Sequence, residues 1–218
     1  MKKIIFAAAL ASLAGILYAD QALGADGAYV SLRGGVGLMA DQDDDNNYGL
    51  TKSSDVGTAF MGALGRQVGD ARIEAEVGYL SNNIQSVQAE GFVLPGTTTG
   101  TTTAIPIMLA GFYDFRNMGS ETFVPYVGAG LGAVHIHENI ESDELGLTEK
   151  GTNFVFGYTF MAGFNAALNQ SFSAGLGYQF LGTTEGSYNL FNSAGASIPY
   201  NDNYYNNLIM ANLTYKFS

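Results

Sequence analysis

The ten residues from Ala71 to Leu80, ARIEAEVGYL, alternate between apolar side chains and charged or small ones. Successive side chains of a β-strand point to opposite faces, so this stretch has one apolar and one charged face. An Arg or Lys that faces lipid at the middle of a bilayer costs about 2–4 kcal/mol. We therefore expect a membrane-crossing strand whose apolar face meets lipid and whose charged residues point inward, namely Arg72, Glu74 and Glu76.

Seven further segments alternate in the same way. They are 28–38, 56–64, 104–115, 124–136, 154–166, 172–181 and 208–217. Repeated alternating segments of about ten residues are typical of a transmembrane β-barrel. The sequence predicts an all-β fold, a transmembrane eight-stranded antiparallel up-and-down β-barrel.

The connectors between these segments alternate in length. Long connectors are 39–55, 81–103, 137–153 and 182–207, and short ones lie near 67–70, 116–122 and 168–170. Outer-membrane barrels have short periplasmic turns and long extracellular loops, and an even strand number places both termini on the periplasmic side. A soluble barrel would hide its aromatic residues inside, whereas Phe154, Phe156 and Phe160 share an apolar face that suits lipid.

The N-terminal segment predicts export. Lys2 and Lys3 precede the apolar run 4–13, and Ala19 and Ala25 each end a stretch that a signal peptidase can cut. We expect residues 1–25 to hold a signal peptide and a short N-terminal segment, and residues 26–218 to form the barrel. A membrane anchor is the alternative, but the apolar run from 4 to 19 is shorter than a membrane-spanning helix needs.

The composition limits the partners and the means of stabilisation. The chain has no Cys, so disulfide bonds cannot stabilise an exported domain. Its formal net charge is -11 with only nine Lys and Arg residues. Because phosphate backbones are bound by clustered cations, nucleic acid is not an expected partner. No cofactor is expected either.

An eight-stranded barrel encloses only enough space for side chains to fill. We expect Arg33, Arg72, Glu74 and Glu76 to form a salt-bridge network that plugs the lumen. Arg33 and Glu76 stand about six residues above the short-turn end of their strands, so they are expected to pair directly. The alternative is a gated path for protons or ions, because ionisable residues at membrane depth are often functional.

Two histidines form one candidate metal site. His135 and His137 lie on one face of a predicted strand, at a spacing that could chelate Zn²⁺ together with a nearby Glu. Rim histidines without a metal are the simpler interpretation. A catalytic histidine would need a serine partner beside it, and Glu138 and Asn139 stand there instead.

The first long connector is rich in acid. Asp41, Asp43 and Asp45 could supply oxygens to Ca²⁺. The EF-hand pattern fails, because Asn46 occupies the position that needs Gly and Lys52 the position that needs Glu. A solvated acidic loop, or one that bridges to lipopolysaccharide through divalent cations, is the alternative.

Two further connectors are biased in composition. Residues 96–103 are Thr-rich and Gly-punctuated, which indicates a flexible connector or a β-hairpin that extends the strands above the membrane. Residues 187–207 are rich in Asn, Tyr and Ser, a chemistry that suits adaptable recognition surfaces.

Three motifs resemble the opacity-like and outer-membrane-protein-A-like eight-stranded barrels, a group that includes many bacterial surface antigens. They are RIEAEVGY at 72–79, PYVGAGLG at 125–132, and the pair YDF at 113–115 and LTYKF at 213–217. The resemblance covers the whole mature chain and implies adhesion, immune exposure, envelope integrity or small-solute passage. It also implies that Tyr215 and Phe217 are the signal read by the outer-membrane assembly machinery, although here Ser218 follows the final aromatic residue.

Together these features predict a non-enzymatic surface protein of the bacterial outer membrane, in contact with its lipid and lipopolysaccharide. Its barrel would present four long loops for adhesion or recognition of a host-cell or other extracellular ligand, or for envelope integrity. The alternative is a narrow channel for small or hydrophobic solutes. That alternative rests on small lumen-facing residues, namely Gly128, Gly130, Gly132, Gly175 and Gly177.

Overall fold

The computed structural model describes residues 27–39, 42–43, 50–54, 56–89, 92–93, 98–118, 122–142, 147–191 and 197–217. Side chains are described in 27–39, 56–82, 101–118, 122–137, 154–186 and 203–217. The expected signal peptide and Ser218 lie outside the described residues. No helix in the described part of the chain is long and apolar enough to cross a membrane.

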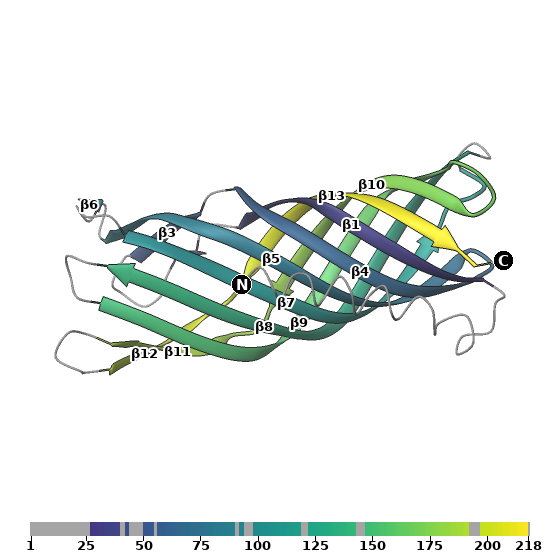
Figure 1. Ribbon diagram of the computed structural model, residues 1–218. Helices are drawn as coiled ribbons and strands as arrows, with labels where there is room; N and C mark the ends of the chain where they lie inside the picture. The colour runs from purple at the N-terminus through teal and green to yellow at the C-terminus, as the bar shows by residue number, and fades with distance from the viewer. Residues whose placement is uncertain are drawn as a thin grey trace.

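Eight long strands form a closed antiparallel barrel (Figure 1). They are β1 (Ala28–Met39), β4 (Val56–Val68), β5 (Ala71–Ala89), β7 (Thr98–Asp114), β8 (Phe123–Ser142), β9 (Leu147–Ala167), β10 (Phe172–Thr183) and β13 (Tyr205–Lys216). Each strand pairs with the next along the chain, β13 pairs with β1, and the β9–β10 pairing completes the circle. The predicted eight-stranded up-and-down barrel is confirmed.

The connectors were predicted too long. Three of the four predicted long connectors contain short strands. These strands are β2 (Gln42–Asp43), β3 (Leu50–Ser54), β6 (Phe92–Val93), β11 (Gly186–Phe191) and β12 (Ser197–Asp202). β7 already begins at Thr98, and its residues 98–103 pair with β8. For these residues the strand interpretation holds rather than the flexible one. Thr favours extended backbone, so pairing continues where apolar alternation ends.

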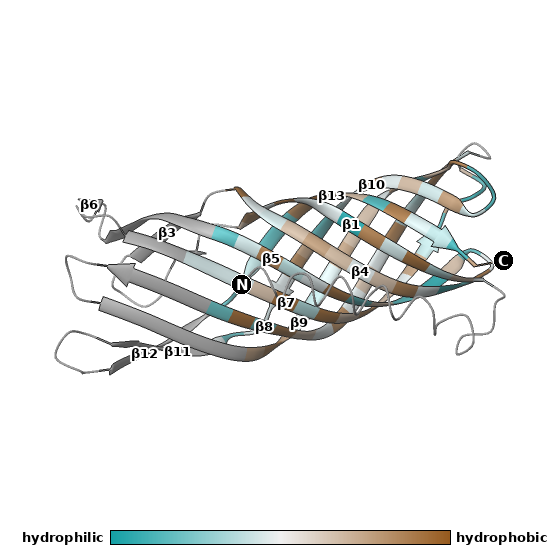
Figure 2. Cartoon of the chain, in the orientation of Figure 1, coloured by the Kyte–Doolittle hydropathy of each residue, from teal (hydrophilic) through white to brown (hydrophobic). Residues whose placement is uncertain are grey.

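The two faces of the strands are sorted as predicted. Ile73 is 62% exposed and Glu74 only 1%, one residue apart on β5. On β9, Phe154 is 71% exposed, and Phe156 and Phe160 share its outward face. Apolar and polar residues therefore alternate along the strands of the wall (Figure 2). The outer face suits hydrocarbon, and the polar side chains fill the inside.

The lumen has three layers. Near the short turns lies what we call the charged cluster, which consists of Tyr29, Arg33, Arg72, Glu74, Glu76 and Asp114. Above it is an apolar layer, whose larger members are Met61, Leu80, Met108, Val134, Ile136, Leu208 and Met210. Toward the long loops follows the amide cluster, which consists of Asn82, Thr102, Tyr204 and Asn206.

The lumen-facing glycines do not leave open space, contrary to the expectation that supported a channel. A Cβ on Gly128 would clash with the ring of Phe112, and one on Gly177 with the hydroxyl of Tyr126. A Cβ on Gly132 would lie 2.8 Å from the sulfur of Met108. Large side chains of neighbouring strands pack over these three glycines. The glycines therefore accommodate the side chains that fill the lumen.

Candidate functional site

Arg33 on β1 lies between two carboxylates of β5. Its Nη1 is 2.9 Å from Oε1 of Glu76, and its Nη2 contacts Oε2 of Glu74. The two glutamate side chains are fully buried, and the Arg33 side chain is 9% exposed. The structure therefore pairs Arg33 with Glu76 at one height, as their positions along the strands indicated. Burial makes each partner necessary, since a lone charge here would be unsatisfied.

Arg72 extends the network toward β7. Its Nη1 is 2.9 Å from Oε1 of Glu74, and its Nε is 3.0 Å from Oδ1 of Asp114. Asp114 also accepts a hydrogen bond of 2.8 Å from Nε2 of Gln67. Glu74 is thus shared between two guanidinium groups, and both Asp114 oxygens have partners.

Aromatic residues enclose these charges. Tyr29 donates a hydrogen bond of 2.6 Å to Oε1 of Glu74. The guanidinium carbon of Arg72 lies 4.6 Å from the ring centre of Phe112 and 5.2 Å from that of Tyr126. The Arg33 guanidinium lies 5.5 Å from the same Phe112 ring. Cations over ring faces are attracted electrostatically, so the rings both fill space and stabilise the arginines.

The sequence identified part of this cluster. Arg33, Arg72, Glu74 and Glu76 were predicted to meet, and the structure brings them together. The aromatic partners and Asp114 were not assigned to it. The alternation along each strand already placed these side chains on the inward face. The sequence did not show the offset between neighbouring strands, which decides how high along the barrel each side chain lies.

The cluster can close the lumen, because its ion pairs and the Tyr29 hydrogen bond connect side chains of β1, β5 and β7 across the interior. Two atoms remain buried without a hydrogen-bond partner among the described residues, Nη2 of Arg72 and Oε2 of Glu76. In the described part of the chain no group of three or more His, Asp or Glu residues could hold a metal ion.

The candidate metal ligands lie elsewhere. His135 and His137 are on the outward face of β8, and the His135 ring lies 4.6 Å from that of Phe154. Their neighbours Val134 and Ile136 are the residues that point into the lumen. Asp41 and Asp45 lie outside the described residues, as does the side chain of Asp43.

The two residues of the expected assembly signal lie at the short-turn end of the barrel. The rings of Tyr215 and Phe217 are in edge contact at 5.4 Å between centres. Tyr215 also lies 5.0 Å from the ring of Phe172 on β10. Tyr215 is 36% exposed on the outer wall, and its role in assembly stays a prediction.

The family model for the outer membrane protein beta-barrel domain matches residues 6–217. The chain belongs to this family. A family member is located in the bacterial outer membrane, so its short turns face the periplasm and its long loops the exterior. No curated protein sequence matches the chain.

Two solved structures share the fold, and a third is less similar. Neisserial surface protein A is 17% identical, with a TM-score of 0.54 and 89% of this chain and 99% of that chain covered. A major outer membrane protein from Thermus thermophilus is 10% identical, with a TM-score of 0.51 and coverage of 86% and 98%. The outer membrane protease OmpT from Escherichia coli is 11% identical, with a TM-score of 0.49 and coverage of 89% and 98%. At these identities the similarity concerns the fold, and it does not choose a function.

Proposed function

We propose that this outer-membrane barrel is a non-enzymatic surface protein that presents its extracellular segments for adhesion or recognition. The observation that carries the proposal is the filled lumen. The charged cluster closes the periplasmic half, and the apolar layer and the amide cluster follow above it. Above the periplasmic mouth the described interior is occupied by its own side chains, which disfavours transport and favours the exterior as the place of adhesion or recognition.

The lengths of the strands support this assignment. A tilted strand needs about 9–11 residues to cross a bilayer. β5 has 19 residues, β8 has 20 and β9 has 21. The surplus lies at the extracellular ends, so these strands carry the surface segments beyond the headgroups on a hydrogen-bonded sheet. Such a support reduces the entropy that a loop loses on binding.

The hairpin of β11 and β12 is the segment to remove first. Gly186 pairs with Asp202 at its base, so residues 187–201 can be replaced by an Asn-Gly turn without cutting the barrel. We expect bacteria that express this variant to lose adhesion to cultured epithelial cells, while the barrel still migrates as a folded species on unboiled gels. The Glu185→Gln variant, at an exposed position beside the hairpin, serves as the control.

Two results would contradict the proposal. One is unchanged adhesion after each of the four extracellular connectors has been shortened in turn. The other is a reproducible single-channel conductance in planar bilayers that changes in Glu76→Gln, because a steady pore requires an open path through the charged cluster.

A further inference from the structure

The periplasmic mouth of the barrel holds a cavity of about 360 Å³ that the closed lumen leaves open to one side. All eight barrel strands contribute to its wall, and the charged cluster forms its floor through Tyr29, Arg72 and Asp114. Small-molecule sites have volumes of about 300–1,000 Å³. The cavity therefore has room for a small organic ligand that enters from the periplasm.

The charges that line this cavity are mostly positive, although the chain as a whole carries -11. Arg72, Arg116 and Lys216 line it, and among the described residues of the lining Asp114 is the only acid. Both oxygens of Asp114 already accept hydrogen bonds, from Arg72 and from Gln67. The negative charge in the wall is therefore satisfied by the protein itself.

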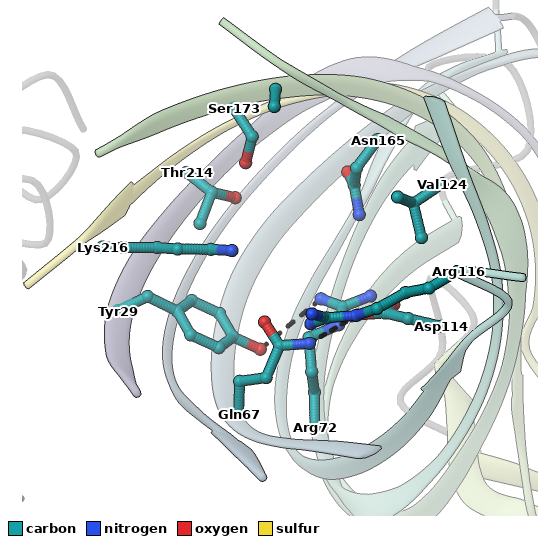
Figure 3. A pocket seen from close by; sticks show the side chains of 11 residues that line it. Tyr29, Gln67, Arg72, Asp114, Arg116, Val124, Asn165, Ser173, Thr214 and Lys216 are labelled. Carbon is teal, nitrogen blue, oxygen red and sulfur yellow. Dashed lines mark hydrogen bonds and ion pairs between the residues drawn. The ribbon is translucent and has the colours of Figure 1, made fainter. Parts of the chain in front are cut away.

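Two of the cations remain available for a ligand. Figure 3 shows Lys216 and Arg116 extending into the cavity from opposite sides. Arg116 contacts Asp70 at 3.4 Å, but both side chains are well exposed, at 46% and 39%, and such a pair is weak. In the described part of the chain Lys216 has no ion pair within 4.0 Å.

Neutral polar groups line the remaining wall. Asn165 on β9 and Ser173 on β10 direct their amide and hydroxyl groups toward the same space (Figure 3). Asn, Ser, Arg and Lys together supply donors for the oxygens of an anion and partners for hydroxyl groups beside it. An apolar ligand would leave these groups unpaired, which disfavours it.

We propose that this cavity is a binding site for a small oxyanion of the periplasm, a phosphate or carboxylate that also carries hydroxyl groups. Lys216 and Arg116 bind the anionic oxygens, and Asn165 and Ser173 bind the hydroxyl groups. The same chemistry is offered by a free solute and by a phospholipid headgroup of the periplasmic leaflet. The site is independent of the extracellular segments, so it stands whether or not the protein is an adhesin.

The test uses the full barrel in a maltoside detergent, which carries no anion, with glycerol 3-phosphate as the probe and glycerol as its neutral counterpart. Calorimetric titration is expected to show saturable binding of glycerol 3-phosphate and none of glycerol. Because two charge-assisted hydrogen bonds are removed, the double variant R116Q/K216Q should bind about tenfold more weakly or worse. A second arm titrates short-chain phosphatidylglycerol and distinguishes a lipid headgroup from a free solute.

Arg66→Gln is the matched control, because Arg66 lies near the same end of β4 but is exposed on its outer face. Its binding should equal that of the native protein. Unboiled gels establish that each variant is folded before titration. The proposal is overturned if neither probe binds, if glycerol binds as well as glycerol 3-phosphate, or if Arg66→Gln weakens binding as much as the double variant does.

Discussion

The charged cluster and the amide cluster occupy opposite ends of one lumen, and they satisfy their buried polar side chains in different ways. In the charged cluster two arginines share three carboxylates, with Tyr29 and aromatic rings around them. In the amide cluster Asn206 Nδ2 donates to Asn82 Oδ1 at 3.1 Å and to the Tyr204 hydroxyl at 2.7 Å. One cluster depends on charge, and the other on neutral hydrogen bonds.

The difference lies in what each cluster leaves unsatisfied. The amide cluster keeps three buried polar atoms without a hydrogen-bond partner among the described residues, Nδ2 of Asn82, Oγ1 of Thr102 and Oδ1 of Asn206. The charged cluster keeps two, Nη2 of Arg72 and Oε2 of Glu76, but both of these ions have partners through their other atoms. A neutral amide tolerates a missing bond, or binds a water molecule, at a cost far below that of an unpaired buried ion. The comparison teaches that the tightly specified end of the lumen is the charged one.

The largest effect is expected from removing Glu74, the acid that both arginines and Tyr29 share. Glu74→Ala removes one carboxylate partner from each of two buried arginines, which retain Glu76 and Asp114, and breaking a buried ion pair costs about 3–5 kcal/mol. Urea unfolding of the barrel in lipid vesicles measures the loss. Glu74→Gln keeps an acceptor oxygen and should lose less.

The control for that prediction is the same substitution at an exposed site. Glu185→Ala is expected to change the free energy of unfolding by no more than about 0.5 kcal/mol. If Glu74→Ala is no more destabilised than this control, the charged cluster does not specify the lumen, and the contrast between the two clusters disappears.

A second experiment asks whether the charged cluster acts as a unit. We expect Arg33→Met and Glu76→Met to couple by about 0.5–3 kcal/mol, with the double variant more stable than the sum of the single losses. The reason is that removing both ions removes the uncompensated charge as well. The same cycle with Asn82→Leu and Asn206→Leu should give a smaller coupling. Additive losses at Arg33 and Glu76 would show that their 2.9 Å contact carries no specific energy.

The two clusters also differ in how far the sequence revealed them. Strict alternation at 71–80 placed Glu74 and Glu76 inward, because exposing a charge to lipid is expensive. Asn82 continues the same inward row of β5, yet it lies in a segment read as connector, since the apolar face ends near Leu80. The partner Asn206 was missed for the same reason. Strand membership beyond the membrane depends on pairing with a neighbour, and a single sequence does not display pairing.

Packing around the charged cluster was also hidden from the sequence. Glycines on the inner face suggested free space, but the space is filled by side chains from adjacent strands, such as Phe112 over Gly128. The presence of small residues does not reveal which side chain of an adjacent strand packs over them. The stagger of the strands decides this, and it became visible only in the register of β7 and β8.

Gly128→Ala therefore tests the support of the charged cluster with a single methyl group. The added Cβ meets the Phe112 ring that packs against both arginines, so we expect a loss of about 1–3 kcal/mol from overpacking. Gly111→Ala is the matched control on the neighbouring strand, where a Cβ has nothing within 4 Å. Equal unfolding free energies for the two variants would show that the Phe112 ring moves aside at no cost.

The smallest effect is expected in the amide cluster. Asn206→Leu removes two hydrogen bonds, each worth about 1 kcal/mol net, but it also removes the unpartnered Oδ1 and adds apolar contact in a fully buried position. These terms oppose each other, so the net loss should be about 1 kcal/mol. The comparison variant Asn207→Leu on the outer face removes one exposed hydrogen bond, the one that Asn207 accepts from the Tyr178 hydroxyl. A loss as large as that of Glu74→Ala would mean that the amide cluster is as tightly specified as the charged one, with Asn82 and Tyr204 depending on Asn206 as the arginines depend on Glu74.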